Sequence, residues 1–118
     1  MTPGPDTRLV ALLGDPVDHS LSPRFQNAAI RAAGLDAVYL PLRCDGERFA
    51  GLFRGIAEAG GMGNITLPHK TRAVPLLDEA TAAVRRTGAC NTFWVAEERV
   101  HGDNTDVEGF ARAARQLI

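Results

Sequence analysis

A short apolar run near the start of the chain constrains the fold more than any other feature of the sequence. Leu9–Leu13 contains no polar residue, and Gly14-Asp15-Pro16 ends it. A strand with one face in water alternates apolar and polar residues, whereas a continuous run of this length is typical of a strand covered on both faces. We therefore predict a strand at Leu9–Leu13 with helices on each side of it.

Helices follow this run and end at recognisable signals. Ser22 as N-cap, with proline at the first helical position, predicts a helix that ends at Gly34. Asp45 predicts the cap of another helix, whose apolar residues recur at i, i+3, i+4 and i+7, namely Phe49, Leu52, Phe53 and Ile56. Two more helices are expected, at about Asp78–Thr87 and, opened by a capping box, from Thr105 to the end of the chain.

Strand patterns alternate with these helices. Besides Leu9–Leu13, we predict strands at Ala37–Leu42, Asn64–Leu67, Ala89–Val95 and Val100–Gly102. A short polar turn joins the last two strands, which suggests a hairpin with one antiparallel strand. The predicted fold class is therefore α/β, a three-layer sandwich with a mostly parallel sheet that contains one antiparallel strand.

The length of the chain fits a single domain. A chain of 118 residues is long enough to bury one real core, and too short for two. Residues 1–8 are polar and include two prolines and a glycine, so we expect a disordered N-terminus. Residues 9–118 are expected to form the domain.

The composition is that of an ordinary globular protein. Thirteen basic and fourteen acidic residues leave a formal net charge of -1, which gives no support to nucleic-acid or membrane binding. Cys44 and Cys90 have neither metal-ligand spacing nor the density of a disulfide scaffold. We expect both to be buried, reduced thiols in a cytoplasmic protein.

Polar residues gather where the predicted strands end and helices begin. Ser20 and Ser22 precede a helix N-terminus, which attracts a carboxylate or phosphate. Lys70 and Asp103 are an amine and a carboxylate able to move a proton on a hydroxyl or ketone if they converge. The amides of Asn64 and Asn91, each at a strand end, can bridge hydroxyl groups.

Each of these residues also has a purely structural interpretation. Ser22 can serve only as a helix cap, Lys70 and Asp103 can be unrelated surface charges, and the two asparagines can be turn or edge residues. Other motifs are not supported. The glycines at 60–63 lead into a strand, whereas a phosphate loop leads into a helix. The three histidines show no metal-ligand pairing, so no metal is predicted.

Three stretches together resemble the N-terminal substrate domain of the shikimate dehydrogenase family. The first is His19-Ser20-Leu21-Ser22-Pro23 and the second is Asn64–Lys70. The third pairs Gly88-Ala89-Cys90-Asn91-Thr92 with Gly102-Asp103-Asn104-Thr105-Asp106. Each motif is modest alone, but their order and spacing match the family from near residue 9 to the end of the chain.

This resemblance implies an NADP-linked, reversible reduction of 3-dehydroshikimate to shikimate, in the pathway to aromatic amino acids. It implies that Ser20 and Ser22 hold the substrate carboxylate. By the same family motifs, the ring hydroxyls would be bound by Thr66, Asn91 and Asp103, with Asn64 beside them. Lys70 would be the acid/base group, with Asp103 as its partner, so residues 9–118 would form the substrate-binding and catalytic domain.

No dinucleotide fingerprint follows any predicted strand, so we expect the NADP-binding domain to be absent from this chain. The chain is then expected to bind shikimate without turning it over. Two alternatives remain at this point: a dehydrogenase that prefers quinate or an amino-shikimate, with NADP or NAD, and a non-catalytic module that binds a polyhydroxylated carboxylic acid. The sequence does not indicate an oligomeric state.

Overall fold

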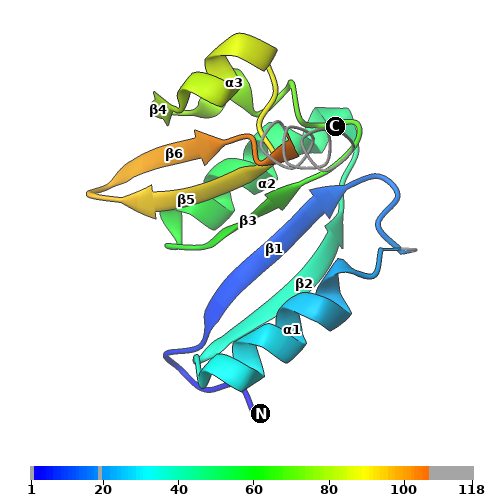
Figure 1. Ribbon diagram of the computed structural model, residues 1–118, viewed down its shortest axis with the longest axis vertical. Helices are drawn as coiled ribbons and strands as arrows, with labels where there is room; N and C mark the ends of the chain where they lie inside the picture. The colour runs from blue at the N-terminus through cyan, green and yellow to red at the C-terminus, as the bar shows by residue number, and fades with distance from the viewer. Residues whose placement is uncertain (1, 19, 107–118) are drawn as a thin grey trace, which may run out of the picture.

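The computed structural model describes residues 2–18 and 20–106, which form a six-stranded sheet with helices on both faces (Figure 1). The strands lie in the order β2-β1-β3-β5-β6-β4. Their bounds are Arg8–Gly14 for β1, Ala37–Arg43 for β2, Met62–Ile65 for β3, Glu79–Ala80 for β4, Thr92–Ala96 for β5 and Arg99–Asp103 for β6.

The strand directions confirm a mostly parallel sheet. The strand β1 pairs in parallel with both β2 and β3, and β4 pairs in parallel with β6. Only β5 runs the other way among the described strands, because it is antiparallel to β3 and to β6. This is the single antiparallel strand that the sequence predicts.

Alternating side chains of β1 supply both faces of the sheet, which explains its uninterrupted apolar sequence. Ala11 and Leu13 face α2 (Gly46–Glu58), whose Phe49 and Phe53 belong to the same buried cluster. Leu12 belongs to a second cluster, against which Ile30 of α1 (Ser22–Ala33) packs. The two helices thus cover opposite faces, which confirms the predicted three layers (Figure 1).

The caps of the helices differ from prediction at one point. Asp45 caps α2 as expected, since its carboxylate accepts from the Arg48 N–H at 2.9 Å. The N-cap of α1 is Leu21, however, and no side chain caps it. The prediction of Ser22 as N-cap is therefore wrong: Ser22 is already the first helical residue, and it is the hydroxyl of Ser20 that accepts from the Ser22 N–H.

The segment predicted as one helix at Asp78–Thr87 is divided in the structure. Glu79–Ala80 is the short strand β4, and the helix α3 covers only Ala82–Thr87, capped by the Thr81 hydroxyl. Hydrogen bonds from the Asp78 N–H to the Val100 carbonyl and from the Thr81 N–H to the Gly102 carbonyl hold this strand to β6. A 3-10 turn, η1 (Val74–Leu76), precedes it.

Two other segments bear on the predictions. The residues before β1 make a turn in which the Gly4 N–H donates to the Thr7 hydroxyl, and that hydroxyl donates to Asp36 at 2.7 Å. The sequence predicts disorder at residues 1–8, whereas the structure has this turn there and begins β1 at Arg8. The predicted last helix lies outside the described residues after Asp106.

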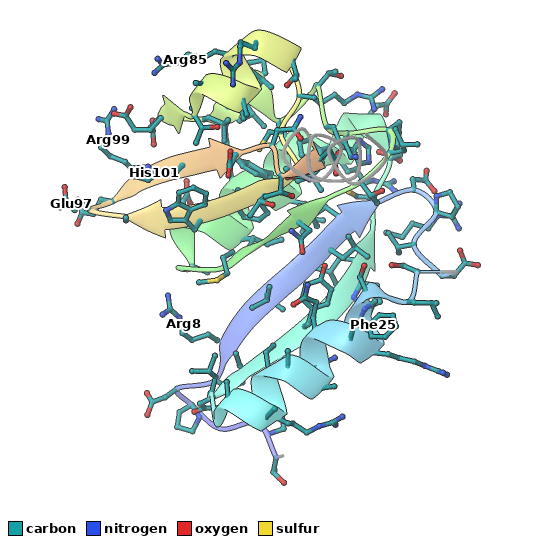
Figure 2. The ribbon with its side chains drawn as sticks, viewed as in Figure 1. Arg8, Phe25, Arg85, Glu97, Arg99 and His101 are labelled. Carbon is teal, nitrogen blue, oxygen red and sulfur yellow. The ribbon has the colours of Figure 1, made fainter. Side chains whose placement is uncertain are left out.

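The hairpin end of the sheet is remote from the polar strand ends. Figure 2 shows Glu97, Arg99 and Arg85 pointing outward at the β4–β6 side. None of the described helices is long and apolar enough to cross a membrane.

The carboxyl ends of β1, β3 and β6 and the amino end of β5 meet at one edge of the sheet. Strand ends of this kind are where open α/β sheets bind small ligands.

Candidate active site

A cavity of about 360 Å³ lies at this edge of the sheet. Its lining is Leu12, Pro16, Ser20, Ser22, Asn64, Ile65, Thr66, Lys70, Asn91 and Asp106. Six of the seven predicted site residues are therefore brought together by the fold, and Asp103 alone is not among the lining residues. The cavity walls carry hydroxyl, amide, ammonium and carboxylate groups, a donor and acceptor set suited to a small polar ligand.

The cavity has one wall at the start of α1. The Ser20 hydroxyl accepts from the Ser22 N–H at 3.2 Å, and the Ser20 N–H donates to the Val17 carbonyl at 3.2 Å. Both serines are half-buried. Because the positive end of the helix dipole lies here, this wall suits an anionic group of a ligand.

The end of β3 supplies another part of the lining. The Thr66 N–H donates to the Leu13 carbonyl at 2.8 Å, which continues the pairing of β1 with β3 by one residue. The Thr66 methyl group packs directly on Gly14, where a Cβ would overlap it. The Thr66 hydroxyl is thus held at a fixed place beside the cavity.

Lys70 is fixed by its own backbone and by its neighbour. Its carbonyl accepts from the Cys90 N–H at 2.8 Å. The preceding His69 is fully buried and stacked on Phe49, with Nε2 2.6 Å from the Cys44 carbonyl oxygen. Since the Arg72 guanidinium can only donate, His69 Nδ1 accepts from it at 3.1 Å, and Nε2 carries the proton.

The Lys70 ammonium bonds a different carboxylate from the one expected. It forms an ion pair with Asp106 at 2.8 Å, and its side chain is 27% exposed. Asp103, the expected partner, accepts through Oδ1 from the Thr81 hydroxyl at 2.7 Å and from the Asn104 N–H at 2.8 Å. The distance along the sequence could not decide between two carboxylates that lie three residues apart.

The two asparagines of the cavity are extensively hydrogen-bonded. Asn91 Nδ2 donates to the Thr105 hydroxyl at 2.9 Å and to Asp106 at 3.1 Å. Asn64 Oδ1 accepts from the phenol of buried Tyr39 at 2.8 Å. Burial raises the pKa of Tyr39 from 10.0 to about 12, so the phenol stays protonated and donates at neutral pH. Both amides therefore have fixed orientations.

Sequence reasoning missed three contributors: Asp106, Tyr39 and Thr92. The sequence holds one further signal, namely that Lys70 is the only lysine in a chain whose other basic side chains, histidines aside, are all arginines. An ammonium gives up its proton far more readily than a guanidinium, so a lone lysine marks a position where proton transfer is useful. Asp106 and Thr92 belong to quoted motifs, but their contacts depend on the folded structure.

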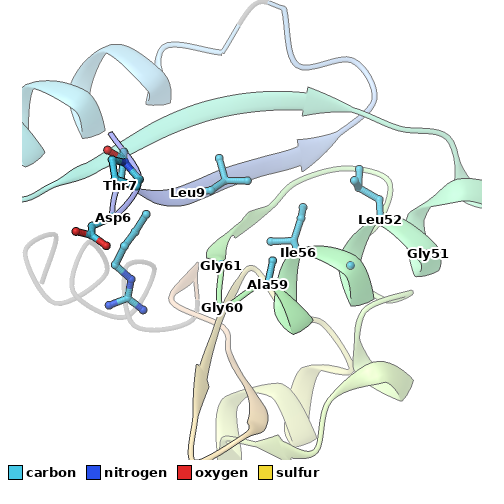
Figure 3. Close-up of a pocket in the computed structure, with 12 residues that line it drawn as sticks. Asp6, Thr7, Leu9, Gly51, Leu52, Ile56, Ala59, Gly60 and Gly61 are labelled. Atoms are coloured by element: carbon cyan, nitrogen blue, oxygen red, sulfur yellow. The ribbon is translucent and has the colours of Figure 1, made fainter. Parts of the chain in front are cut away.

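A second hollow is larger but chemically different. It measures about 740 Å³ and lies between the beginning of β1 and α2 (Figure 3). Leu9, Leu52 and Ile56 line it together with several glycines of α2 and the following turn. It lacks the converging hydroxyl and amide groups of the smaller cavity, which we therefore take as the candidate active site.

In the described part of the chain, no cluster of side chains suits a metal ion, and the glycine-rich turn does not suit a dinucleotide. No group of three or more potential metal ligands occurs among those residues. The glycines at 60–63 run into β3, whereas the turn that binds a dinucleotide pyrophosphate opens a helix. These glycines do not fit an NADP phosphate.

The sequence and the structure both match known proteins. Residues 12–93 match the family described as the shikimate dehydrogenase substrate binding domain. A shikimate dehydrogenase (NADP(+)) from Crocosphaera subtropica is 43% identical over 112 residues, which are 94% of this chain and 39% of that protein. The chain thus spans well under half the length of this relative.

Two solved structures have closely similar folds. The shikimate dehydrogenase of Aquifex aeolicus superposes with a TM-score of 0.92 at 39% identity, over 99% of this chain and 44% of that one. The enzyme of Thermus thermophilus, in complex with NADP(H) and shikimate, superposes with a TM-score of 0.84 at 36% identity, over 92% and 42% of the two chains.

Proposed function

The chain belongs to the shikimate dehydrogenase substrate-binding domain family, and on this premise we propose that its cavity binds shikimate or 3-dehydroshikimate. The convergence of six predicted site residues on one small polar cavity carries the proposal. Both ligands are ring carboxylic acids with several hydroxyl groups, which need the donors and acceptors that line this cavity. The cytoplasmic location expected from the sequence stays a prediction.

The ligand carboxylate is proposed to lie against Ser20 and Ser22, where two hydroxyls and the helix dipole favour negative charge. The ring hydroxyls would then face Thr66 and Asn91 across the cavity. The hydrogen bond from the Ser22 N–H to the Ser20 hydroxyl supports this orientation, because it leaves the Ser20 proton free to donate to an anion.

Lys70 is proposed to be the proton donor and acceptor for a ligand oxygen. Its side chain is mostly buried at the cavity wall and held there by Asp106. A lysine ammonium next to a carboxylate can donate a proton to a ketone oxygen and recover it from the alcohol. Asp103 is held by Thr81 and does not line the cavity, so its predicted contact with a ligand hydroxyl stays a prediction.

We further propose that this domain acts within a longer NADP-dependent oxidoreductase that interconverts 3-dehydroshikimate and shikimate. The names of the relatives and the share of their length that this chain spans support this proposal. Because the described residues do not fit the dinucleotide, the cofactor would be held by a part of the protein beyond them.

Calorimetric titration of the chain tests the binding proposal. Shikimate is expected to bind, and quinate, which has the same carboxylate on a differently hydroxylated ring, measures how selective the cavity is. Benzoate, which has the carboxylate but no hydroxyls, is expected to bind much more weakly. Equal binding of benzoate and shikimate would show that the hydroxyl contacts proposed for Thr66 and Asn91 do not form.

Lys70→Met in the longer protein tests the proton-transfer role. A positioned general acid contributes roughly 10²–10⁴-fold to the rate, so kcat is expected to fall by about this factor while KM changes much less. Thr7→Val, at the other end of β1, serves as a control variant outside the cavity. A Lys70→Met protein with kcat within about threefold of the parent, where chemistry limits turnover, contradicts the role.

A further inference from the structure

Three neighbouring strands place a row of polar side chains beside the cavity. Thr92, the first residue of β5, lies directly opposite Asn64 of β3 and directly opposite Asp103 of β6. Residues that face each other across a ladder point to the same side of the sheet. Thr92 is therefore flanked by two predicted ligand residues, although it does not itself line the cavity.

The orientation of the Asn64 amide is dictated by a neighbour that can only accept. The main-chain carbonyl of Asn91 lies 3.3 Å from Asn64 Nδ2, so the NH2 end of the amide faces β5. The oxygen end then faces Tyr39, whose phenol must donate to it at 2.8 Å. The same NH2 group donates to the Thr92 hydroxyl at 3.2 Å.

The orientation of the Asn91 amide is dictated in the same way from the other side. The Thr105 N–H can only donate, and it donates to Asn91 Oδ1 at 3.1 Å. The Asp106 carboxylate accepts from Asn91 Nδ2 at 3.1 Å. The Thr92 hydroxyl, whose lone pair already accepts from Asn64, donates its proton to Asn91 Oδ1 at 2.9 Å.

These hydrogen bonds form one chain with a single direction. It runs from the Tyr39 phenol through Asn64, Thr92 and Asn91 to the carboxylate of Asp106. Its last member is the group that pairs with the Lys70 ammonium. The Thr92 hydroxyl is the link at which the two amides meet, because it accepts from one and donates to the other.

We propose that Thr92 is a positioning residue, whose hydroxyl fixes the Asn64 and Asn91 amides and thereby sets the affinity of the cavity for its hydroxylated ligand. The identity of that ligand rests on the proposed function. Without the hydroxyl, Asn64 Nδ2 and Asn91 Oδ1 each lose a partner at a half-buried or buried position. Each amide keeps its other partners, so its orientation stays, but the side-chain link between the two amides through Thr92 is lost and their positions relative to each other are no longer fixed.

The test compares Thr92→Val, which keeps the branched shape and removes the hydroxyl, with Thr92→Ser, which keeps the hydroxyl. In the free chain, Thr92→Val is expected to shift the side-chain amide NMR signals of Asn64 and Asn91. In a shikimate titration it is expected to raise Kd on the order of tenfold, the size that corresponds to the loss of one hydrogen bond. Thr92→Ser is expected to leave the two amide signals close to their positions in the parent and to keep Kd within about twofold of the parent value.

Thr7→Val is the matched control. The Thr7 hydroxyl also donates a hydrogen bond, at 2.7 Å to Asp36, but it precedes β1 at the opposite end of the sheet. Loss of this bond is expected to lower stability without moving the asparagine signals or Kd. Equal effects of Thr7→Val and Thr92→Val on the shikimate Kd would reduce Thr92 to a general stability role and overturn the proposal.

The amide signals decide the proposal even without a ligand. If the parent fails to bind shikimate while Thr92→Val shifts both asparagine signals, the proposed function fails, whereas the hydrogen bonds from Thr92 to the two amides stand. Unchanged asparagine signals in Thr92→Val overturn the proposed positioning role of Thr92. If that variant does not fold, the parent decides: Asn64 amide protons that exchange with water as fast as those of free asparagine overturn the proposal.

Discussion

At the scale of single residues, the position of Lys70 depends on groups that never touch the cavity. His69 is buried between the Cys44 carbonyl and the Arg72 guanidinium, and this holds the turn that carries the lysine. The Cys90 N–H fixes the lysine carbonyl from the other side. The side chain proposed to transfer the proton is thus carried by a backbone held on both sides, as a positioned acid/base group requires.

Tyr39 allows a direct test of how deeply the first group of the hydrogen-bond chain is buried, because it is the only tyrosine in the sequence. Its pKa is about 12 in the folded protein, against 10.0 for an unperturbed phenol. The raised pKa contributes stability that is present below pH 10 and lost as the pH rises towards 12. In an absorbance titration we expect ionisation only near this higher value or together with unfolding. Ionisation near pH 10 in a chain whose circular dichroism is unchanged contradicts the raised pKa of Tyr39.

Substitutions of the two serines are expected to differ in their effect on stability. Ser20 is expected to contribute to stability, whereas the sequence suggests Ser22. Ser20→Ala removes the acceptor of the Ser22 N–H, so it should cost about 1 kcal/mol of unfolding free energy as well as shikimate affinity. Ser22→Ala should cost affinity with little change in stability, because the Ser22 side chain caps nothing. Urea unfolding and shikimate titration of both variants check this. A larger stability loss in Ser22→Ala refutes the assignment.

At the scale of elements, local patterns predicted most of the elements that depend on local contacts. The apolar run of β1 and the Asp45 cap with its spaced phenylalanines placed β1 and α2 within a residue or two. The same reasoning failed at β4, where Glu79–Ala80 has a helix-favouring neighbourhood but pairs with the distant strand β6. Strand pairing depends on the partner, which a local pattern does not contain.

The candidate site, too, was predicted only in part. Motif order predicted which residues gather at the cavity, because the carboxyl ends of parallel strands meet at one edge. It did not predict that Lys70 bonds Asp106, or that Ser20 supplies the hydroxyl at the start of α1. Both depend on the turn geometry after a strand, which a local sequence pattern does not specify.

The hairpin turn between β5 and β6 yields a prediction at this scale. Glu97 and Glu98 both have positive φ, 53° and 63°, in the left-handed region that disfavours residues with a Cβ. Glu98→Gly is expected to raise the unfolding free energy by about 1 kcal/mol. The same substitution at Glu58, the last residue of α2, should lower it. Chemical denaturation of both variants measures the difference, and a destabilised Glu98→Gly protein contradicts the turn geometry.

At the scale of the whole molecule, the sheet separates two hollows of different chemistry. The smaller cavity collects hydroxyl, amide and ammonium groups from distant parts of the chain. The larger one is lined mainly by apolar and small residues beside α2. We expect a hydroxylated carboxylate to bind in the first and not in the second, because only the first can replace the hydrogen bonds that the ligand makes with water.

Chemical-shift mapping of this chain with shikimate tests that claim most directly. Because Lys70 is the only lysine, selective lysine labelling gives one amine signal that reports on the proposed proton donor. We predict that shikimate shifts this signal and the amide signals of Ser20, Thr66 and Asn91, and leaves those of Leu9 and Ile56 in the larger hollow unmoved. Shifts confined to the larger hollow, or an unmoved Lys70 signal at saturating shikimate, would contradict the account.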